Sequence, residues 1–493
     1  HPVAHSFPTR RSSDLFLEDP LEYVDSVTFA PAGDRIAIAA RGQLVLAGLP
    51  TSRRIPIPVS RELRARQARL SPDGGAVYAL VADGQQDEIV RYAADGSGGV
   101  TPVTRGGDAR RERMVLSPNG VLLAHNDFRG RLWLTDMDTG TSTVVSEFPA
   151  GGDAHLEFAF SPDSKLLAFT ESPAPSERAQ LYLYEIDSGR GMRVASGRFS
   201  AYSPAFSPDG RWLYFLSDRN FSANPGSPWG DRNLGPVFDA RGQILALDLT
   251  AEGRFPFLPE VLGGPSASEE ENNPSEQENN VDEGTADAAE PAVDVVWSGL
   301  DARLYKVPVD PGNFSRLRAT RDRLFVLREP WGGEKELLSI PVEDSPEAGV
   351  FAEKVEDYDL SLDGKRLYFR AEDKLYIVDA GAKAPEDLSD ATVSLDNWRL
   401  ALSPQDEWEQ MFHDAWRMHR DFSFDPAMRG LDWEAIRDRY APLLARITHR
   451  EELEDLLGEM IAELDILHSA VRGAELPEDD ASPVAATLAA EFR

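Results

Sequence analysis

A strand-like phrase recurs along most of the chain. It usually opens with Ser-Pro-Asp-Gly or a close variant and continues into a short run that is apolar on both faces, as in FSPDGRWLYFL from Phe206. Proline fixes φ at the second position of a type I turn, and glycine suits the fourth. A strand with two apolar faces needs a packed neighbour on each side. The phrase therefore predicts small antiparallel sheets that stack against one another.

Seven copies of this phrase can be aligned. They begin at Phe29, Leu70, Leu116, Phe160, Phe206, Leu317 and Leu360. Successive copies lie 41 to 46 residues apart, except for a gap of 111 residues between Phe206 and Leu317. A period in the forties is typical of propeller blades, which close a ring without long exposed edges. We therefore expect a seven-bladed β-propeller over residues 16–402.

The long gap has a composition unlike the rest of the chain. Residues 268–290 read SEEENNPSEQENNVDEGTADAAE, with nine acidic residues, no basic ones and very little apolar surface. Such a segment cannot bury enough surface to offset the entropy of ordering it. We expect a disordered acidic insertion over residues 265–292, inside the propeller.

The periodicity changes from strand to helix after Trp398. Ser403 and Pro404 suit the start of a helix, and apolar residues then follow at spacings of three and four. A second helix is expected from Asp432, and a third after a capping box formed by Thr448 and Glu451, ending near Ile466. The fold class is thus mainly β with a C-terminal α/β part over residues 403–493.

Composition narrows the classes of function. The formal net charge is -33, which argues against nucleic acid or an anionic membrane as partner, and the chain contains no cysteine. It has no apolar run of about 18 residues. Residues 5–15, HSFPTRRSSDL, resemble a translated sequencing adapter, so residues 1–15 are expected to be an artefact. A natural basic tail or transit peptide is the alternative.

His468 is the candidate catalytic residue. It follows the third helix in the stretch AELDILHSAVR, where helix carbonyls favour an imidazolium and could serve a proton acceptor. A structural histidine beside apolar residues is the competing interpretation. His413 and His419 are six residues apart, a poor spacing for shared metal ligands, and neither H-E-x-x-H nor G-x-S-x-G occurs. No metal or cofactor is expected.

Two stretches resemble the tricorn protease family, a propeller-bearing branch of the serine peptidases. One is SDRNFSANPGSPWGDRNLGPVFD from Ser217, and the other extends from EWEQMFHDAWRMHRDF at Glu407 to ELDILHSAVRG at Gly473. Together with seven blades, the resemblance covers nearly everything after residue 15. It implies that His468 is the general base of a peptidase. Leu467 stands where archaeal members often have a supporting serine.

The resemblance also implies which parts of the enzyme lie elsewhere. The family continues after this region with a PDZ domain and a second catalytic subdomain, and the latter supplies the nucleophilic serine, the oxyanion-hole amides and an orienting glutamate. The chain alone is therefore expected to be inactive. Its propeller would filter or channel peptide substrates, in a homo-oligomer that is a hexamer in the family, with downstream aminopeptidases as further partners.

Two alternatives remain at this point. The family implies a cytoplasmic location, but a periplasmic one stays open. A non-enzymatic propeller scaffold that binds peptides or carbohydrates would carry the same repeats, because repeats fix architecture and not chemistry.

Overall fold

The computed structural model describes most of the chain. The described residues are 15–17, 20–49, 53–60, 63–82, 86–147, 157–171, 178–223, 238–258, 293–395, 398–423, 425, 427–466 and 469–471. The predicted artefact (apart from Leu15) and the acidic insertion at 265–292 lie outside them. Contacts divide the chain into a unit from Phe16 to Leu400 and a second unit that contains Ala401–Arg493.

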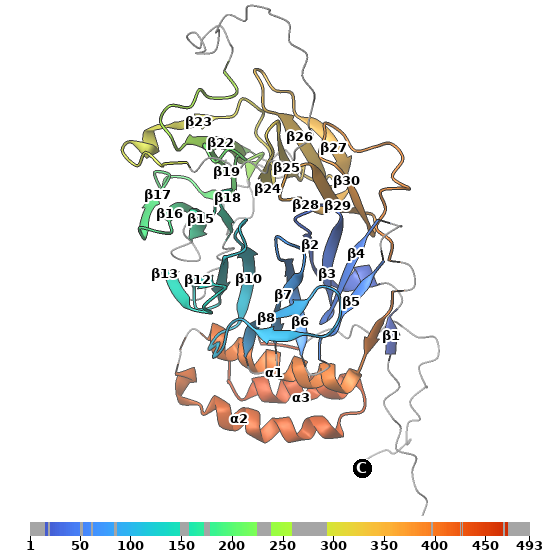
Figure 1. Ribbon diagram of the computed structural model, residues 1–493. Helices are drawn as coiled ribbons and strands as arrows, with labels where there is room; N and C mark the ends of the chain where they lie inside the picture. The colour runs from blue at the N-terminus through green and yellow to red at the C-terminus, as the bar shows by residue number, and fades with distance from the viewer. Residues whose placement is uncertain are drawn as a thin grey trace, which may run out of the picture. The chain divides into compact units, whose positions relative to one another are not determined.

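The first unit is a seven-bladed β-propeller. Each blade is one antiparallel sheet, made of consecutive strands in every blade but the fifth, and Figure 1 shows the blades arranged around a central axis. Blades one to three are β2 (Val24–Phe29), β3 (Arg35–Ala40), β4 (Gln43–Gly48) and β5 (Ile55–Ile57); β6 (Arg64–Leu70), β7 (Ala76–Ala82), β8 (Asp87–Ala93) and β9 (Val100–Pro102); and β10 (Arg111–Leu116), β11 (Leu122–Asp127), β12 (Arg131–Asp136) and β13 (Ser142–Glu147).

The remaining blades follow the same order, with one interruption. They are β14 (Phe158–Phe160), β15 (Leu166–Glu171), β16 (Gln180–Glu185) and β17 (Arg190–Arg193); β18 (Ala201–Phe206), β19 (Trp212–Asp218), β22 (Gly242–Asp248) and β23 (Leu304–Lys306); β24 (Phe314–Ala319), β25 (Arg323–Arg328), β26 (Glu336–Pro341) and β27 (Gly349–Glu353); and β28 (Val355–Leu360), β29 (Arg366–Ala371) and β30 (Lys374–Asp379). The fifth blade absorbs the long gap, because a small hairpin, β20 (Ser222–Ala223) and β21 (Phe238–Asp239), and the segment after β22 both interrupt it. Two further short strands are β1 (Leu15–Leu17) and β31 (Leu400–Leu402).

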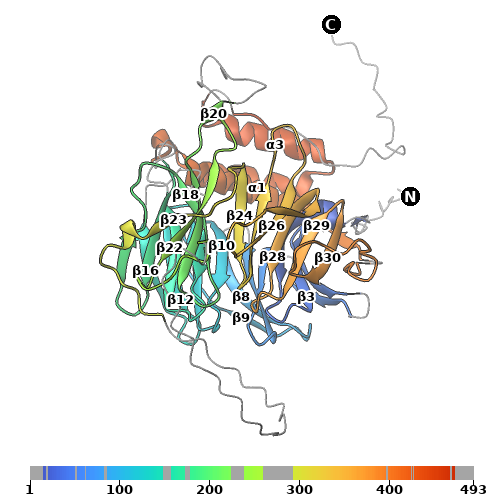
Figure 2. The same ribbon diagram turned by 90° about the horizontal axis from the view of Figure 1, so that it is seen from above.

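The ring closes by packing between complete blades. The first strands of neighbouring blades contact one another around the ring, and Figure 2 shows strands of adjacent blades running side by side. At the seam, the Tyr368 ring packs edge-on against Phe29, and its hydroxyl donates to the Val27 carbonyl (3.2 Å). In the described part of the chain, blades one and seven exchange no strand.

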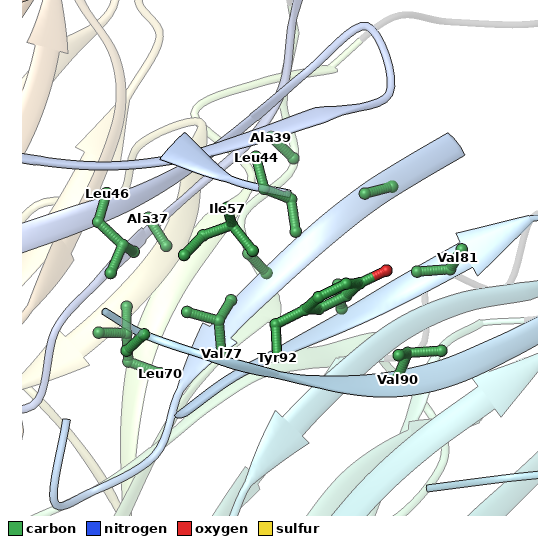
Figure 3. Packing of buried hydrophobic residues seen from close by; sticks show 14 of the residues in the cluster. Ala37, Ala39, Leu44, Leu46, Ile57, Leu70, Val77, Val81, Val90 and Tyr92 are labelled. Carbon is green, nitrogen blue, oxygen red and sulfur yellow. The ribbon is translucent and has the colours of Figure 1, made fainter. Parts of the chain in front are cut away.

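Apolar side chains fill the spaces between blades. Figure 3 shows the cluster between the first two blades, where Leu44 and Ile57 of one sheet lie near Val77 and Tyr92 of the next. Each of these side chains is buried. A sheet packed on both faces in this way accounts for strands such as β7, in which every residue is buried.

The turn at the start of five of the seven phrases is held by its serine and by an aspartate or asparagine two residues later. In the fifth blade, the Gly210 amide donates to the Ser207 carbonyl (2.9 Å), and glycine takes the positive φ of 69° that the turn requires. The Ser207 hydroxyl donates to Asp209 (2.5 Å) and accepts from the Trp212 amide (3.0 Å). The same pattern recurs at Ser71, Ser117, Ser161 and Ser361.

The second unit is helical where it is described. It contains α1 (Pro404–Phe422), α2 (Trp433–Tyr440) and α3 (Arg450–Ala462), with short 3-10 turns between them. Ser403 is the N-cap of α1, as the sequence predicts, and the apolar stripe of α1 packs against α2 and α3. Trp416 and Trp433 each donate the indole N–H to the other's backbone carbonyl (2.9 and 3.0 Å), which fastens α1 to α2.

Two sequence expectations about α3 are wrong in detail. The N-cap is His449 rather than Thr448, and the capping carboxylate is Glu452 rather than Glu451, accepting from the Thr448 amide (2.6 Å). The helix also ends at Ala462 and not near Ile466. Asp465 has a positive φ of 48°, a left-handed conformation that an α-helix cannot continue through.

Candidate functional site

Charged residues occupy bulges in the inner strands of the propeller. Among the described pairs, six of the first strands shift register against the second strand of their blade, near the start of the first strand. We call the residues at these shifts the bulge ring: Asp25, Arg66, Glu112, Arg113, Ser203, Pro204, Arg316, Leu317 and Glu356. A bulge redirects a side chain out of the regular alternation of a strand. Five of the six register shifts contain at least one charged residue.

Backbone strain accompanies the ring in two blades. Ser203 and Arg316 have φ values of 55° and 53°, which are uncommon for residues other than glycine. The Ser203 hydroxyl accepts from the Leu317 amide (2.9 Å), so the two strained bulges hold each other across neighbouring blades. Strain that persists in this way is often found at functional positions.

Most charges of the bulge ring are paired. The Oδ1 atom of Asp25 lies 3.7 Å from Nη2 of Arg64. Arg66 pairs with the buried Asp87, and Arg316 pairs with Asp357. The two remaining acids also have partners. Nη2 of Arg370 lies 2.6 Å from Oε2 of Glu356, and the Asn126 amide donates to Oε2 of Glu112 (2.7 Å).

The pKa values of two carboxylates, Asp25 in the bulge ring and Asp359 in the last inner strand, are shifted by their surroundings. Burial raises the pKa of Asp25 despite the nearby Arg64 guanidinium. Burial would also raise the pKa of Asp359, but the guanidiniums of Arg318 and Arg69 hold it below its usual value. The carboxylate of Asp359 therefore stays ionised beside Arg318, whose Nε donates to it (2.8 Å).

Side chains of β6 fix the neighbouring inner strand in parallel register. Arg66, Gln67 and Arg69 donate to the carbonyls of Arg111, Glu112 and Met114, respectively (3.0, 2.6 and 3.0 Å). Each pair is separated by 45 residues, one period of the repeat. The ends of β6 and β10 that carry the bulges consequently lie at the same rim of the propeller.

A cationic pocket lies at this rim. It has a volume of about 250 Å³ and is lined by Arg66, Arg110, Glu112, Arg113 and Phe128. The Arg110 guanidinium lies 5.4 Å from the centre of the Phe128 ring. Its Nε is buried without a hydrogen-bond partner among the described residues. No carboxylate pairs with Arg110 or Arg113 within the described ranges, so the pocket keeps uncompensated positive charge.

The segment before the predicted general base is anchored in the helical unit. Leu464 and Val471 both pack against the helical core. The Asp465 carbonyl accepts from Arg429 (3.3 Å), and Glu463 accepts from Tyr440 (2.9 Å). His468 itself, with Leu467, lies outside the described residues, so its role as general base stays a prediction.

The other candidate histidines lie on one helix. His413 and His419 are half-buried on α1, and burial lowers the pKa of each. Within the described ranges, no three His, Asp or Glu side chains group as metal ligands would. No helix in that part of the chain is long and apolar enough to cross a membrane.

The sequence interpretation missed the bulge ring and its pocket. The signal was the charge pattern just before each turn phrase, as in RARQARL of β6 and RERMVL of β10. Charges within strands that are otherwise buried mark positions where a side chain leaves the alternation.

The chain is similar to known proteins both in sequence and in structure. The model of the tricorn protease second beta propeller domain matches residues 24–381, and that of the tricorn protease C1 domain matches residues 404–462. A tricorn protease homolog of Streptomyces coelicolor is 30% identical over 428 residues, which cover 81% of this chain and 38% of that protein. One of Saccharolobus solfataricus is 25% identical over 452 residues, covering 89% of this chain and 38% of that protein.

The fold agrees with these sequence matches. The crystal structure of the tricorn protease superposes with a TM-score of 0.73 at 20% identity, covering 93% of this chain and 42% of that one. The chain therefore spans less than half the length of these three proteins. A propeller model that matches most of the chain, followed in order by a C1 model, shows that this protein belongs to the tricorn protease family.

Proposed function

We propose that this chain supplies the propeller and the base-bearing subdomain of a serine endopeptidase that degrades peptides or unfolded polypeptides. The proposal rests on the helical unit, which matches the C1 domain as far as residue 462 and whose core includes Leu464 and Val471, before and after His468 in the sequence. A base must be held in place to accept a proton from its nucleophile. The packing of Leu464 and Val471 on either side of His468 supports that role.

In this proposal, the reaction is acyl transfer. His468 takes the proton of a serine hydroxyl as the oxygen attacks a peptide carbonyl, and backbone amides stabilise the oxyanion before water releases the acyl group. The serine, these amides and an orienting glutamate belong to a second catalytic subdomain of the complete enzyme. The 493-residue chain alone is expected to be inactive, because a base without a nucleophile forms no acyl-enzyme.

The propeller has the role of a substrate filter in this proposal. Its ring of charges near the axis offers hydrogen-bonding groups to an extended peptide. Assembly into a homo-oligomer, a cytoplasmic location and cooperation with aminopeptidases are further expectations that accompany the family.

Hydrolysis by the longest reading frame that contains this sequence is the decisive test. That protein and the 493-residue chain are each assayed on internally quenched peptides, with and without His468→Ala. We expect cleavage only by the longer protein, abolished by the substitution. Cleavage that survives His468→Ala, or a reading frame that adds no serine-bearing subdomain, would contradict the proposal and favour the non-enzymatic scaffold.

A further inference from the structure

The pocket at Arg110 and Arg113 is cationic within a strongly acidic chain. The chain carries 84 acidic and 51 basic side chains, and the neighbouring Arg66 has a carboxylate partner in Asp87. Arg110 and Arg113 have no such partner among the described residues. Glu112 provides one negative charge to the pocket, and its carboxylate accepts from Asn126 (2.7 Å).

Arg110 and Arg113 line the same pocket, and Glu112 offsets only one of their two charges. The buried Nε of Arg110 adds an unmade hydrogen bond. An anionic ligand in the pocket offsets the remaining charge and can accept that hydrogen bond. The planar fork of a guanidinium matches a carboxylate with two parallel hydrogen bonds.

We infer that this pocket is a subsite for a carboxylate carried by an extended peptide, with an Asp or Glu side chain as its ligand. The volume of about 250 Å³ exceeds what a carboxylate alone fills, and Phe128 provides an apolar wall for the methylene groups behind it. The rim location, where inner strands begin, suits a peptide that approaches the axis. This inference rests on the proposed function, because it assumes that the propeller receives peptides.

The charge of the pocket is positive, whereas the net charge of the whole protein is negative. A net charge of -33 repels acidic peptides at long range, so they bind only where local cations outweigh that field. The subsite would select acidic segments against an unfavourable background. Neutral peptides lack the charge that would pair with Arg110 and Arg113.

Binding of blocked peptides to the 493-residue chain tests the subsite by calorimetry. Three hexapeptides are compared: one with two central Glu residues and both ends blocked, its Gln counterpart, and the Gln peptide with a free C-terminal carboxylate. We expect the Glu peptide to bind about tenfold more tightly than the blocked Gln peptide, since charge-assisted hydrogen bonds are worth at least this much. Tighter binding of the free-carboxylate peptide alone would assign the ligand to a chain terminus and overturn the side-chain assignment.

Variants separate the pocket from general electrostatics. Arg113→Gln should reduce the affinity for the Glu peptide about tenfold and leave the blocked Gln peptide unchanged. Glu112→Gln should strengthen binding of the Glu peptide, a gain that a purely structural role does not produce. Arg91→Gln removes the same charge from an exposed position of β8 and serves as the matched control.

The outcomes separate this inference from the proposed function. Equal affinity for Glu and Gln peptides, or equal losses with Arg113→Gln and Arg91→Gln, overturns the subsite even if the complete enzyme cleaves peptides. Orthophosphate that binds as tightly as the Glu peptide also overturns it, because the pocket would then be a general anion site. Binding that depends on Arg113 without hydrolysis by the longer protein would support the subsite and refute the peptidase.

Discussion

The buried carboxylate of Asp87 provides a sharp test of how the blades are joined. Its side chain is fully buried at the start of β8, where it pairs with Arg66 of β6. The same carboxylate accepts from the Arg111 amide of β10 (2.9 Å). Asp87 therefore links the second blade to the third, and Asp87→Asn removes its charge while keeping its size.

The expected loss follows from what remains after the substitution. The Arg66 side chain is only 15% exposed, so its charge stays largely buried after the Asp87 carboxylate is lost. Removing one member of a buried ion pair typically costs about 3–5 kcal/mol. The asparagine oxygen can still accept from the Arg111 amide, which places the expectation near the lower end, about 3 kcal/mol. That value changes the ratio of folded to unfolded protein more than about a hundredfold.

Asp108→Asn is the matched control. Asp108 also pairs with two arginines, Arg129 and Arg131, but its side chain is 52% exposed. Solvent screens such pairs, and losing them typically costs less than about 1 kcal/mol. Urea unfolding followed by far-UV circular dichroism would compare the two variants with the parent. Equal shifts of the unfolding midpoint, or an Asp87→Asn loss below about 1 kcal/mol, would refute the reasoning.

Three further predictions concern pH, close packing and the helical unit. Burial holds the pKa of His125 well below 6.5, so a proton binds more readily to the unfolded state than to the folded one. The free energy of unfolding is therefore at its full value above about pH 6.5 and falls as the pH drops, by up to about 1.4 kcal/mol per pH unit. Between about pH 7 and pH 5, the urea unfolding midpoint of His125→Gln should shift less than that of the parent protein. Equal pH dependence of the two midpoints would contradict this. A Cβ at Gly107 would lie 2.6 Å from the Asp87 carbonyl oxygen, whereas one at Gly381 meets nothing within 4 Å. Gly107→Ala should lower the free energy of unfolding by about 1–3 kcal/mol, and Gly381→Ala should change it very little. Thermal unfolding would compare the two variants, and equal melting temperatures would contradict the prediction. Trp433→Phe removes the indole N–H that bonds the Trp416 carbonyl of α1 and should cost the helical unit about 1–3 kcal/mol. Amide hydrogen exchange in α1 measures this loss, and unchanged exchange would speak against it.

The number and order of the blades could be predicted because the turn phrase is a local signal. Ser207, Asp209 and Gly210 make their hydrogen bonds within six residues of chain, so the same letters give the same turn wherever they occur. The helices of the second unit were predictable for a similar reason, since apolar spacing and a proline at the first turn act locally. These features need no knowledge of the tertiary structure.

The bulge ring could not be predicted in the same way. A bulge is a mismatch between two strands, and neither strand of the pair carries it alone, as β10 against β11 shows between Arg111 and Met114. The early end of α3 depends on Asp465 in a left-handed conformation, which aspartate tolerates but does not require. The cationic pocket depends further on which arginines find partners across blades, and that is settled only when the ring is assembled.

The seam between the first and last blades has a consequence for how such rings change over generations. No described blade borrows a strand from another blade, although insertions interrupt the fifth, and the closing contact joins Tyr368 of the last blade to Phe29 of the first. A duplication or deletion of one repeat therefore adds or removes a whole sheet without leaving an unpaired strand behind. A change of one whole blade is thus open to such a ring by a single genetic step.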